Sequence, residues 1–241
     1  MIKTVLFVEG QTELIFTREL LLKYFEYSDI EIICLRLVTD SNTEKAEYDF
    51  QNENATYHFQ IINVGNDKSV LSAILKREKY LVQNEYKKII GLRDMYSKEY
   101  KEMSIKIEVD LIKKFIEETN KVINNLNSEI EIQFHFAIME IEAWFLGIQN
   151  IFEKFDPTLT NNFIREKLGM NLDTIDPEQN IFHPTDEVDK ILNLIGVKYS
   201  KSKSVVGSIV GCIEKEHIIT LLKSEKCKSF RGYWKDVIPS F

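Results

Sequence analysis

The stretch VLFVEGQTELIF, residues 5–16, places an acid and a glycine directly after an apolar run, and a second acid one helical turn later. The apolar run is typical of a buried strand, and the residues after Thr12, a plausible N-cap, have helical spacing. We therefore expect a strand, a tight turn and a helix, with Glu9 ending the strand and Glu13 near the start of the helix.

The same alternation continues along the first half of the chain. Apolar runs that suit strands are separated by segments with helical period, whereas residues 39–56 are polar and acidic and indicate a loop. Strands that alternate with helices predict an α/β fold, a mostly parallel sheet covered by helices on both faces. The expected strands are 3–8, 31–38, 58–64, 86–94 and 131–139, and the expected helices are 12–26, 67–80 and 108–126.

The pattern changes near residue 153. Pro157, Pro177 and Pro184 interrupt short helical stretches, and no clear strand follows. We expect an α/β core over residues 1–150 and a helical extension over residues 153–241 that packs on it.

Composition limits the class of protein. The chain has 241 residues, of which 44% are hydrophobic and 29% charged, as in an ordinary globular protein. No apolar run approaches the ~20 residues that cross a bilayer, and the start of the chain does not resemble a signal peptide. Three cysteines without CxxC spacing indicate neither a disulfide framework nor a structural zinc site. We expect a cytoplasmic protein with no membrane contact.

Charge is unevenly distributed. The net charge is −7, yet residues 198–241 hold nine Lys and Arg against four acids, so the rest of the chain is strongly acidic. If nucleic acid is the substrate, this basic segment and a metal ion must offset the repulsion between the acidic body and the phosphates. A solvated lysine-rich surface is the alternative.

The acids that follow the predicted strands are the most informative feature. Glu9 ends the first strand, Asp94 ends the fourth, and Glu140 and Glu142 follow the fifth. Because the carboxyl ends of parallel strands open on the same side, these carboxylates should meet in one cleft. Taken singly, each acid could be a cap or a salt-bridge partner. Together they repel each other without a cation, and hard oxygen ligands suit Mg²⁺ or Mn²⁺, so we predict a divalent metal site.

Three motifs resemble a known domain. VEGQTE after the first strand, LRD at a later strand end and EIEAW after a third are similar to the Toprim domain. The closer resemblance is to Toprim-like proteins of the overcoming-lysogenization-defect nuclease type and their small stand-alone relatives. It covers roughly residues 1–150, and YSKS (199–202) and SFRGYW (229–234) resemble the C-terminal part of the small relatives.

The resemblance implies Mg²⁺-dependent cleavage of phosphodiester bonds. It implies that Glu9 is a general acid/base or metal-linked glutamate and that Asp94 is a metal ligand. Glu13 and either Glu140 or Glu142 would complete the metal site.

It also implies a source of positive charge for the transition state. Lys201 would supply it as a catalytic residue, and Arg93 and Lys203 would bind substrate. The metal motif of the wider family is often DxD, but here Tyr96 stands where a second aspartate is expected. Two arrangements of the metal site remain open. The site holds a single ion, or Glu13 and a carboxylate after the fifth strand hold a second one.

The large aromatic residues have two interpretations. Trp144 lies on an apolar helical face and is expected in the core. Trp234, with Phe230 and Tyr233, alternates with basic residues, which suits stacking on nucleic acid but also a terminal amphipathic helix docked on the core. We prefer the docked helix.

Three functions are compatible with these patterns. The first is a Mg²⁺-dependent nuclease acting on DNA or RNA. The resemblance to small Toprim proteins implies that it is an effector of prokaryotic antiviral defence that works with a separately encoded ATPase, and the chain itself has no P-loop. The second is a non-catalytic module that binds a nucleotide or a partner. The third is a phosphoryl-transfer enzyme acting on a small molecule. The sequence leaves open whether the chain forms a homo-oligomer.

Overall fold

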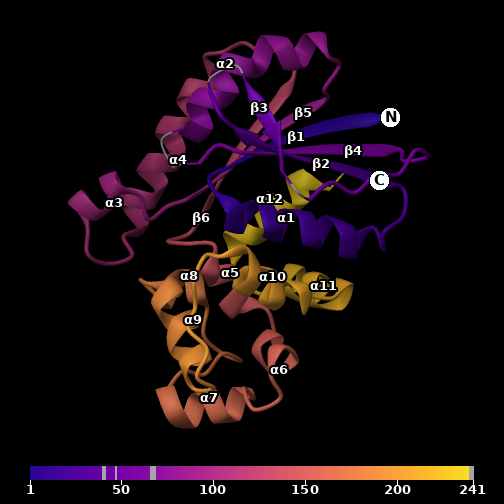
Figure 1. The fold of residues 1–241 in the computed structure, drawn as a ribbon. Helices are drawn as coiled ribbons and strands as arrows, with labels where there is room; N and C mark the ends of the chain where they lie inside the picture. The colour runs from indigo at the N-terminus through magenta and orange to yellow at the C-terminus, as the bar shows by residue number, and fades with distance from the viewer. Residues whose placement is uncertain (40–41, 47, 66–68, 239–241) are drawn as a thin grey trace.

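The computed structural model describes residues 1–39, 42–46, 48–65 and 69–238. These residues form a six-stranded sheet in the order β3-β2-β4-β1-β5-β6 (Figure 1). All neighbouring strands pair in parallel except β2 and β3, which pair antiparallel. The strands are β1 (Ile2–Val8), β2 (Ile30–Leu37), β3 (Thr43–Lys45), β4 (Tyr57–Asn63), β5 (Lys88–Asp94) and β6 (Glu131–Ala137).

Helices connect the strands and make up the C-terminal region, which confirms the predicted α/β class. Among the described residues, no helix is both long and apolar enough to cross a bilayer. The helices of the strand-containing part are α1 (Gln11–Tyr24), α2 (Ser69–Gln83), α3 (Lys98–Met103) and α4 (Val109–Asn124). Those of the C-terminal region are α5 (Glu142–Gly147), α6 (Ile151–Phe155), α7 (Asn161–Leu168), α8 (Pro177–Asn180), α9 (Pro184–Asn193), α10 (Lys203–Gly211), α11 (Lys215–Lys223) and α12 (Lys228–Val237).

Two elements were not expected from the sequence. Strand β3 lies inside the segment 39–56, which the sequence predicted as a loop. Its three residues are polar and form a strand only by pairing with the edge of β2, so the sequence pattern did not indicate it. Helix α3 is also polar, with Tyr100 as its one buried residue, and it begins after Ser97, whose side chain caps it. Positions 40, 41 and 47 of the predicted loop, and Asp67 at the predicted start of the second helix, lie outside the described residues.

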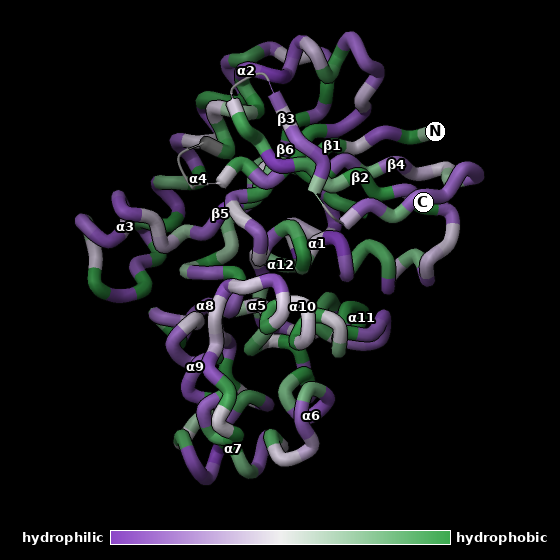
Figure 2. The backbone as a smooth tube through the Cα atoms, viewed as in Figure 1, coloured by the Kyte–Doolittle hydropathy of each residue, from purple (hydrophilic) through white to green (hydrophobic). Residues whose placement is uncertain are grey.

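The two faces of the sheet carry separate apolar clusters, because successive strand side chains point to opposite faces. On β5, Ile90 and Leu92 pack on the face covered by α1 and the C-terminal helices. Ile89 packs on the face covered by α2 and α4. Figure 2 shows hydrophobic and hydrophilic segments alternating along the covering helices, as expected for helices buried on one side. Asp94 follows Leu92 by two residues on β5, so its side chain points to the same face as those of Ile90 and Leu92, toward the C-terminal helices.

The C-terminal helices complete the first of these clusters. Figure 1 shows α12 returning to lie beside α1, whereas α7 and α9 lie farther from the sheet. The Tyr233 hydroxyl is 2.7 Å from Thr17 Oγ1 of α1. Trp144 and Trp234 are both 0% exposed, which confirms that each belongs to the core. Trp144 Nε1 donates to Glu178 Oε1 at 2.9 Å, so its one polar atom is satisfied inside the core.

Candidate functional site

The loops after β1, β5 and β6 are joined by hydrogen bonds at the carboxyl edge of the sheet. Glu9 Oε2 accepts from the backbone N–H of Asp94 at 2.9 Å. Asp94 Oδ1 in turn accepts from the backbone N–H of Ile141 at 2.9 Å. Met139, with φ +62°, turns the chain between β6 and α5, and its carbonyl accepts from the N–H of Tyr96 at 2.8 Å. The predicted meeting of three strand ends is therefore observed.

Glu13 lies in the first turn of α1 and is only 4% exposed. A Cβ atom on Gly10 would lie 3.1 Å from Glu13 Oε2, so the glycine leaves room for this carboxylate against the turn. The helix begins at Gln11 with Gly10 as its N-cap, rather than at Thr12 as expected, and the cap makes no side-chain hydrogen bond. This arrangement explains why a glycine separates the two acids of the VEGQTE motif.

Lys201 reaches into the carboxylates from the loop between α9 and α10. Its Nζ lies 3.3 Å from Glu142 Oε2 and 3.7 Å from Asp94 Oδ2. It is also 4.0 Å from Glu140 Oε1. The C-terminal region thus places an ammonium group among acids from two different strand ends.

Glu140 and Glu142 both belong to the site, but their surroundings differ. Glu142 is 0% exposed, and its Oε1 accepts from the Tyr199 hydroxyl at 2.7 Å. Its Oε2 has no hydrogen-bond donor and contacts only the Lys201 ammonium among the interactions described here. Glu140 Oε2 accepts from the backbone N–H of Thr185 in the first turn of α9 at 3.0 Å. Glu142 is therefore the carboxylate that depends most on a nearby cation.

Sequence reasoning did not identify Tyr199 as a site residue. Its only signal was its place in YSKS, two positions before Lys201. Burial and the Glu142 carboxylate raise its pKa far above the usual value, so the hydroxyl stays protonated and donates to Glu142.

The acids of the site have perturbed protonation. Burial, followed by the charge of Glu9, raises the pKa of Glu13 to about 7. Burial and then Glu13 raise the pKa of Asp94 well above its usual value, although Lys201 opposes this. Burial lowers the pKa of Lys201, but Glu142 and Asp94 outweigh burial and the net pKa is raised. At neutral pH the cluster thus holds a permanent cation among carboxylates that are costly to ionise.

The free energy of unfolding of the metal-free protein should fall as the pH rises from about 4.5 to about 7. The folded-state pKa of Glu13 is raised from 4.5 to about 7, so its contribution is present below the lower value and lost as pH approaches the upper one. At about 1.4 kcal/mol for each pKa unit, the full loss amounts to about 3 kcal/mol. Urea unfolding with EDTA at pH 5 and pH 8 measures this loss. The pH dependence should be weaker in Glu13→Gln, and an unchanged dependence in that variant would contradict the assignment to Glu13.

Among the described residues, Arg93 and Tyr96 both contact aromatic rings. The Arg93 guanidinium lies 5.5 Å from the centre of the Phe136 ring, on the face of β5 opposite to Asp94. Tyr96, in place of a second aspartate, packs its ring 5.1 Å from those of Phe182 and His183. Position 96 thus supplies an aromatic surface and no metal ligand.

The donor set fits a divalent ion held partly by water and substrate. Mg²⁺ in phosphoryl-transfer sites is usually bound by one or two carboxylates together with waters and phosphate oxygens. Glu9 and Asp94 provide such hard oxygens, whereas the fully buried Glu142 Oε2 already has the Lys201 ammonium at 3.3 Å. Within the described ranges, no group of three or more acidic, histidine or cysteine side chains is arranged so that it could hold a metal ion by itself. Glu9 and Asp94 are the residues that would hold such an ion, and waters and substrate would have to supply its other ligands.

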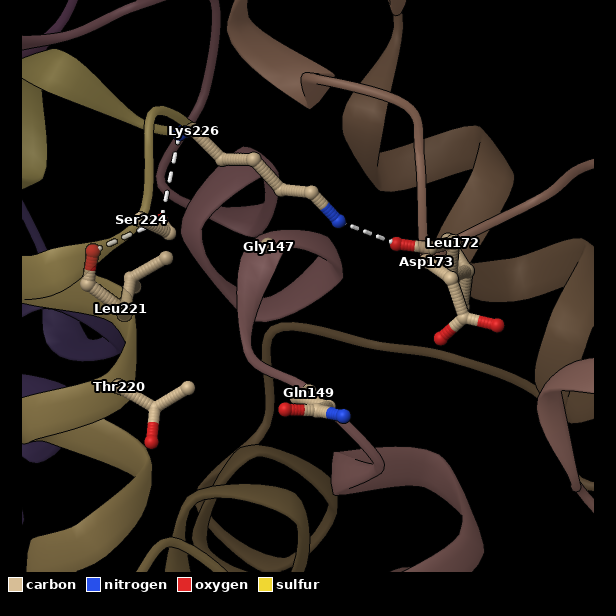
Figure 3. Close-up of a pocket in the computed structure, with 8 residues that line it drawn as sticks. All are labelled: Gly147, Gln149, Leu172, Asp173, Thr220, Leu221, Ser224 and Lys226. Carbon is tan, nitrogen blue, oxygen red and sulfur yellow. Dashed lines mark hydrogen bonds between the residues drawn. The ribbon is translucent and has the colours of Figure 1, made fainter.

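A separate cavity of about 300 Å³ lies in the C-terminal region (Figure 3). Lys226 crosses it and donates from Nζ to the carbonyl of Leu172 at 2.7 Å. None of the site residues predicted from the sequence is among its lining residues, which are Gly147, Gln149, Leu172, Asp173, Thr220, Leu221, Ser224 and Lys226. The carboxylates at the sheet edge, and not this cavity, are therefore the candidate functional site.

Comparisons of the chain with protein-family models, with curated proteins and with solved structures found no match.

Proposed function

We propose that this protein is a Mg²⁺- or Mn²⁺-dependent nuclease that cleaves phosphodiester bonds of DNA or RNA. The observation that carries the proposal is the gathering of Glu9, Asp94 and Glu142 from three strand ends, with the Lys201 ammonium 3.3 to 3.7 Å from two of them. The resemblance of VEGQTE, LRD and EIEAW to Toprim motifs supports the same reaction.

In this proposal, the carboxylates bind the cation and position the substrate phosphate. Glu9 and Asp94 would hold the ion, and Glu13 beside them would supply a further oxygen or accept a proton, since its pKa is about 7. A bound Mg²⁺ would polarise the phosphoryl oxygen and lower the pKa of a coordinated water. The hydrogen bond from the Asp94 N–H to Glu9 Oε2 fixes the two ligands relative to each other before substrate arrives.

Lys201 would stabilise the negative charge that builds on the phosphoryl oxygens during cleavage. Its pKa is raised, so it carries a full charge at neutral pH. Glu142 positions the ammonium, and Tyr199 holds Glu142 through a 2.7 Å hydrogen bond. This preorganisation matters because a fixed charge needs no reorganisation in the transition state.

The proposal extends to cellular context. We propose a cytoplasmic effector of prokaryotic antiviral defence that acts with a separately encoded ATPase, as the resemblance to small Toprim-like proteins implies. The acidic body of the chain also argues for a partner or trigger, because an enzyme with net charge −7 attracts nucleic acid weakly by charge alone.

The experiment is a titration of Mg²⁺ and Mn²⁺ with plasmid DNA, single-stranded DNA and tRNA as substrates. We expect cleavage of at least one substrate that requires the cation and stops with EDTA. Glu9→Gln serves as the control for contaminating nucleases. Cleavage of equal rate in Glu9→Gln, or cleavage that is independent of a divalent cation, would contradict the proposal.

One observation favours a second function. Lys201 already offsets part of the acidic charge, as expected if the edge binds a nucleotide or a partner protein without cutting. If the protein is such a non-catalytic module, it should bind a nucleotide and cleave no substrate. If it is the nuclease, it should both bind and cleave.

A further inference from the structure

The carboxylates paired with the Lys201 ammonium share one pattern of contacts. In each of them, one oxygen accepts a hydrogen bond from the protein and the other oxygen faces the ammonium. The accepting oxygens are Asp94 Oδ1, Glu140 Oε2 and Glu142 Oε1, and their donors are backbone N–H groups or a tyrosine hydroxyl. The other oxygens of the same side chains lie 3.7, 4.0 and 3.3 Å from Lys201 Nζ, respectively. The hydrogen bonds thus direct one oxygen of each side chain at a single cation.

Glu142 is the most buried of these acids. Its side chain is 0% exposed, and its Oε2 has no hydrogen-bond donor. The Lys201 ammonium at 3.3 Å is the positive charge that compensates this oxygen. Since a buried carboxylate is costly to ionise without a nearby cation, the position is suited to a cation, and the chain supplies that cation from its own sequence.

The stretch of chain that carries Lys201 is anchored. Tyr199, two residues earlier, is 5% exposed, and its backbone N–H donates to Asp189 Oδ1 of α9 at 2.8 Å. Its hydroxyl donates to the most buried carboxylate at 2.7 Å. Lys203, expected from the sequence to bind substrate, begins α10, and its ammonium lies 4.7 Å from the centre of the Tyr48 ring. Lys201 is therefore the lysine of this stretch that an ordered segment brings to the carboxylates.

The remaining acids of the site come from the VEGQTE segment. Glu9 Oε2 accepts from the Asp94 N–H at 2.9 Å, and these two residues are the ligands proposed above for the divalent ion. A second divalent ion would need the oxygens of Glu140 and Glu142, which the ammonium already faces. A divalent ion and an ammonium a few ångströms apart repel each other strongly, so the two cations compete for these oxygens.

We propose that the Lys201 ammonium takes the place of a second metal ion, so that the protein binds one divalent cation per chain. The inference deepens the proposed function and rests on it, because it assumes the ion at Glu9 and Asp94. In two-metal sites, ions roughly 4 Å apart stabilise the attacking and the leaving oxygen together. Here the ammonium would supply the second positive charge as a fixed part of the protein. The inference answers the question of ion number that the sequence leaves open.

The test counts the Mn²⁺ ions bound per chain without nucleic acid, by electron paramagnetic resonance and equilibrium dialysis at pH 8. We expect the unchanged protein to bind about one ion and Lys201→Ala about two, because the carboxylate oxygens that lose the ammonium can hold an ion together with waters. Lys201→Gln is a second neutral variant with the same expected count. The double variant Lys201→Ala, Glu142→Gln should return to about one ion, because the most buried carboxylate is then neutral.

Two matched variants separate the effect of the ammonium from other effects. Lys198→Ala removes an exposed lysine of the same loop and changes the net charge equally. Lys201→Arg keeps a cation at the site. Both should bind about one ion, as the unchanged protein does. Circular dichroism with Mn²⁺ present checks that each variant is folded.

Two ions in the unchanged protein would overturn the inference and leave the nuclease proposal standing. A count that does not rise in the folded neutral variants, or that rises equally in Lys198→Ala, would also overturn it. A rise from one ion to two on loss of the ammonium would support the inference even if no substrate is cleaved. The absence of saturable binding in the unchanged protein would overturn both proposals. The two proposals therefore fail separately in the count and in the cleavage assay.

Discussion

Asp94→Asn is expected to slow metal-dependent cleavage by at least about 10³-fold while leaving the folded protein intact. A thousandfold loss corresponds to about 4 kcal/mol of transition-state stabilisation, which is the scale expected when a metal ligand is removed. The asparagine oxygen can still accept from the Ile141 N–H, which Asp94 Oδ1 now accepts at 2.9 Å. The loss should therefore be chemical and not structural.

The same substitution should stabilise the protein when no metal is present. Asp94 is 8% exposed, and burial with Glu13 raises its pKa well above the usual value. At pH 8 an ionised Asp94 therefore costs folding free energy that a neutral asparagine does not. We expect a higher melting temperature in EDTA at pH 8, by about 2–4 °C for each kcal/mol in a chain of this size.

Asp110→Asn is the matched control, because the Asp110 side chain on α4 is fully exposed. It makes the same chemical change away from the site, so it should leave cleavage unchanged and lower stability by no more than about 1 kcal/mol, the scale expected for an exposed acid in the first turn of a helix. Cleavage retained in Asp94→Asn, or lost equally in Asp110→Asn, would refute the role given to Asp94.

Lys201→Met is expected to lower cleavage about 10²-fold and also to destabilise the metal-free protein. The catalytic loss follows from removing one fixed positive charge near the phosphate, for which single donors are worth about 10²–10³. The stability loss arises because Glu142, fully buried, would keep its Tyr199 hydrogen bond but lose the cation at 3.3 Å. Breaking a buried pair costs about 3–5 kcal/mol, and because Lys201 is 43% exposed we expect about 1–3 kcal/mol here.

The pH dependence of the stability loss distinguishes the missing Lys201 charge from a loss of packing. Lys201 lowers the otherwise raised pKa of both Glu13 and Asp94, so its removal makes these buried acids costlier to ionise, and the destabilisation should be larger at pH 8 than at pH 5. Lys198→Met, at an exposed position of the same loop, is the control. Urea unfolding at the two pH values measures the effect. An equal loss of stability at both pH values would show that Lys201 acts through its aliphatic chain alone.

The sequence was sufficient to predict how the acids meet. Apolar runs identified the strands, and parallel pairing then required Glu9 and Asp94 to lie at the same edge, as observed. The position of Arg93 also follows from strand geometry. Its neighbour Asp94 faces the C-terminal helices, and strand alternation points Arg93 to the other face.

Other parts of the site depend on contacts between distant segments. Lys201 meets Glu142 only because the C-terminal helices fold back over the sheet, and no local pattern encodes that contact. Strand β3 forms by pairing with the edge of β2, and a polar strand of three residues has no apolar period to reveal it. Sequence pattern thus located the edge of the sheet, while tertiary packing decided which cations reach it.

The most direct test of the central claim is the binding of Mn²⁺ in the absence of nucleic acid, measured by electron paramagnetic resonance or calorimetry at pH 8. We predict saturable binding to the unchanged protein, at least about tenfold weaker binding to Asp94→Asn, which is about 1.4 kcal/mol, and normal binding to Asp110→Asn. No saturable Mn²⁺ binding, or equal binding in all three proteins, would contradict the claim that the carboxylates at this edge bind a divalent cation.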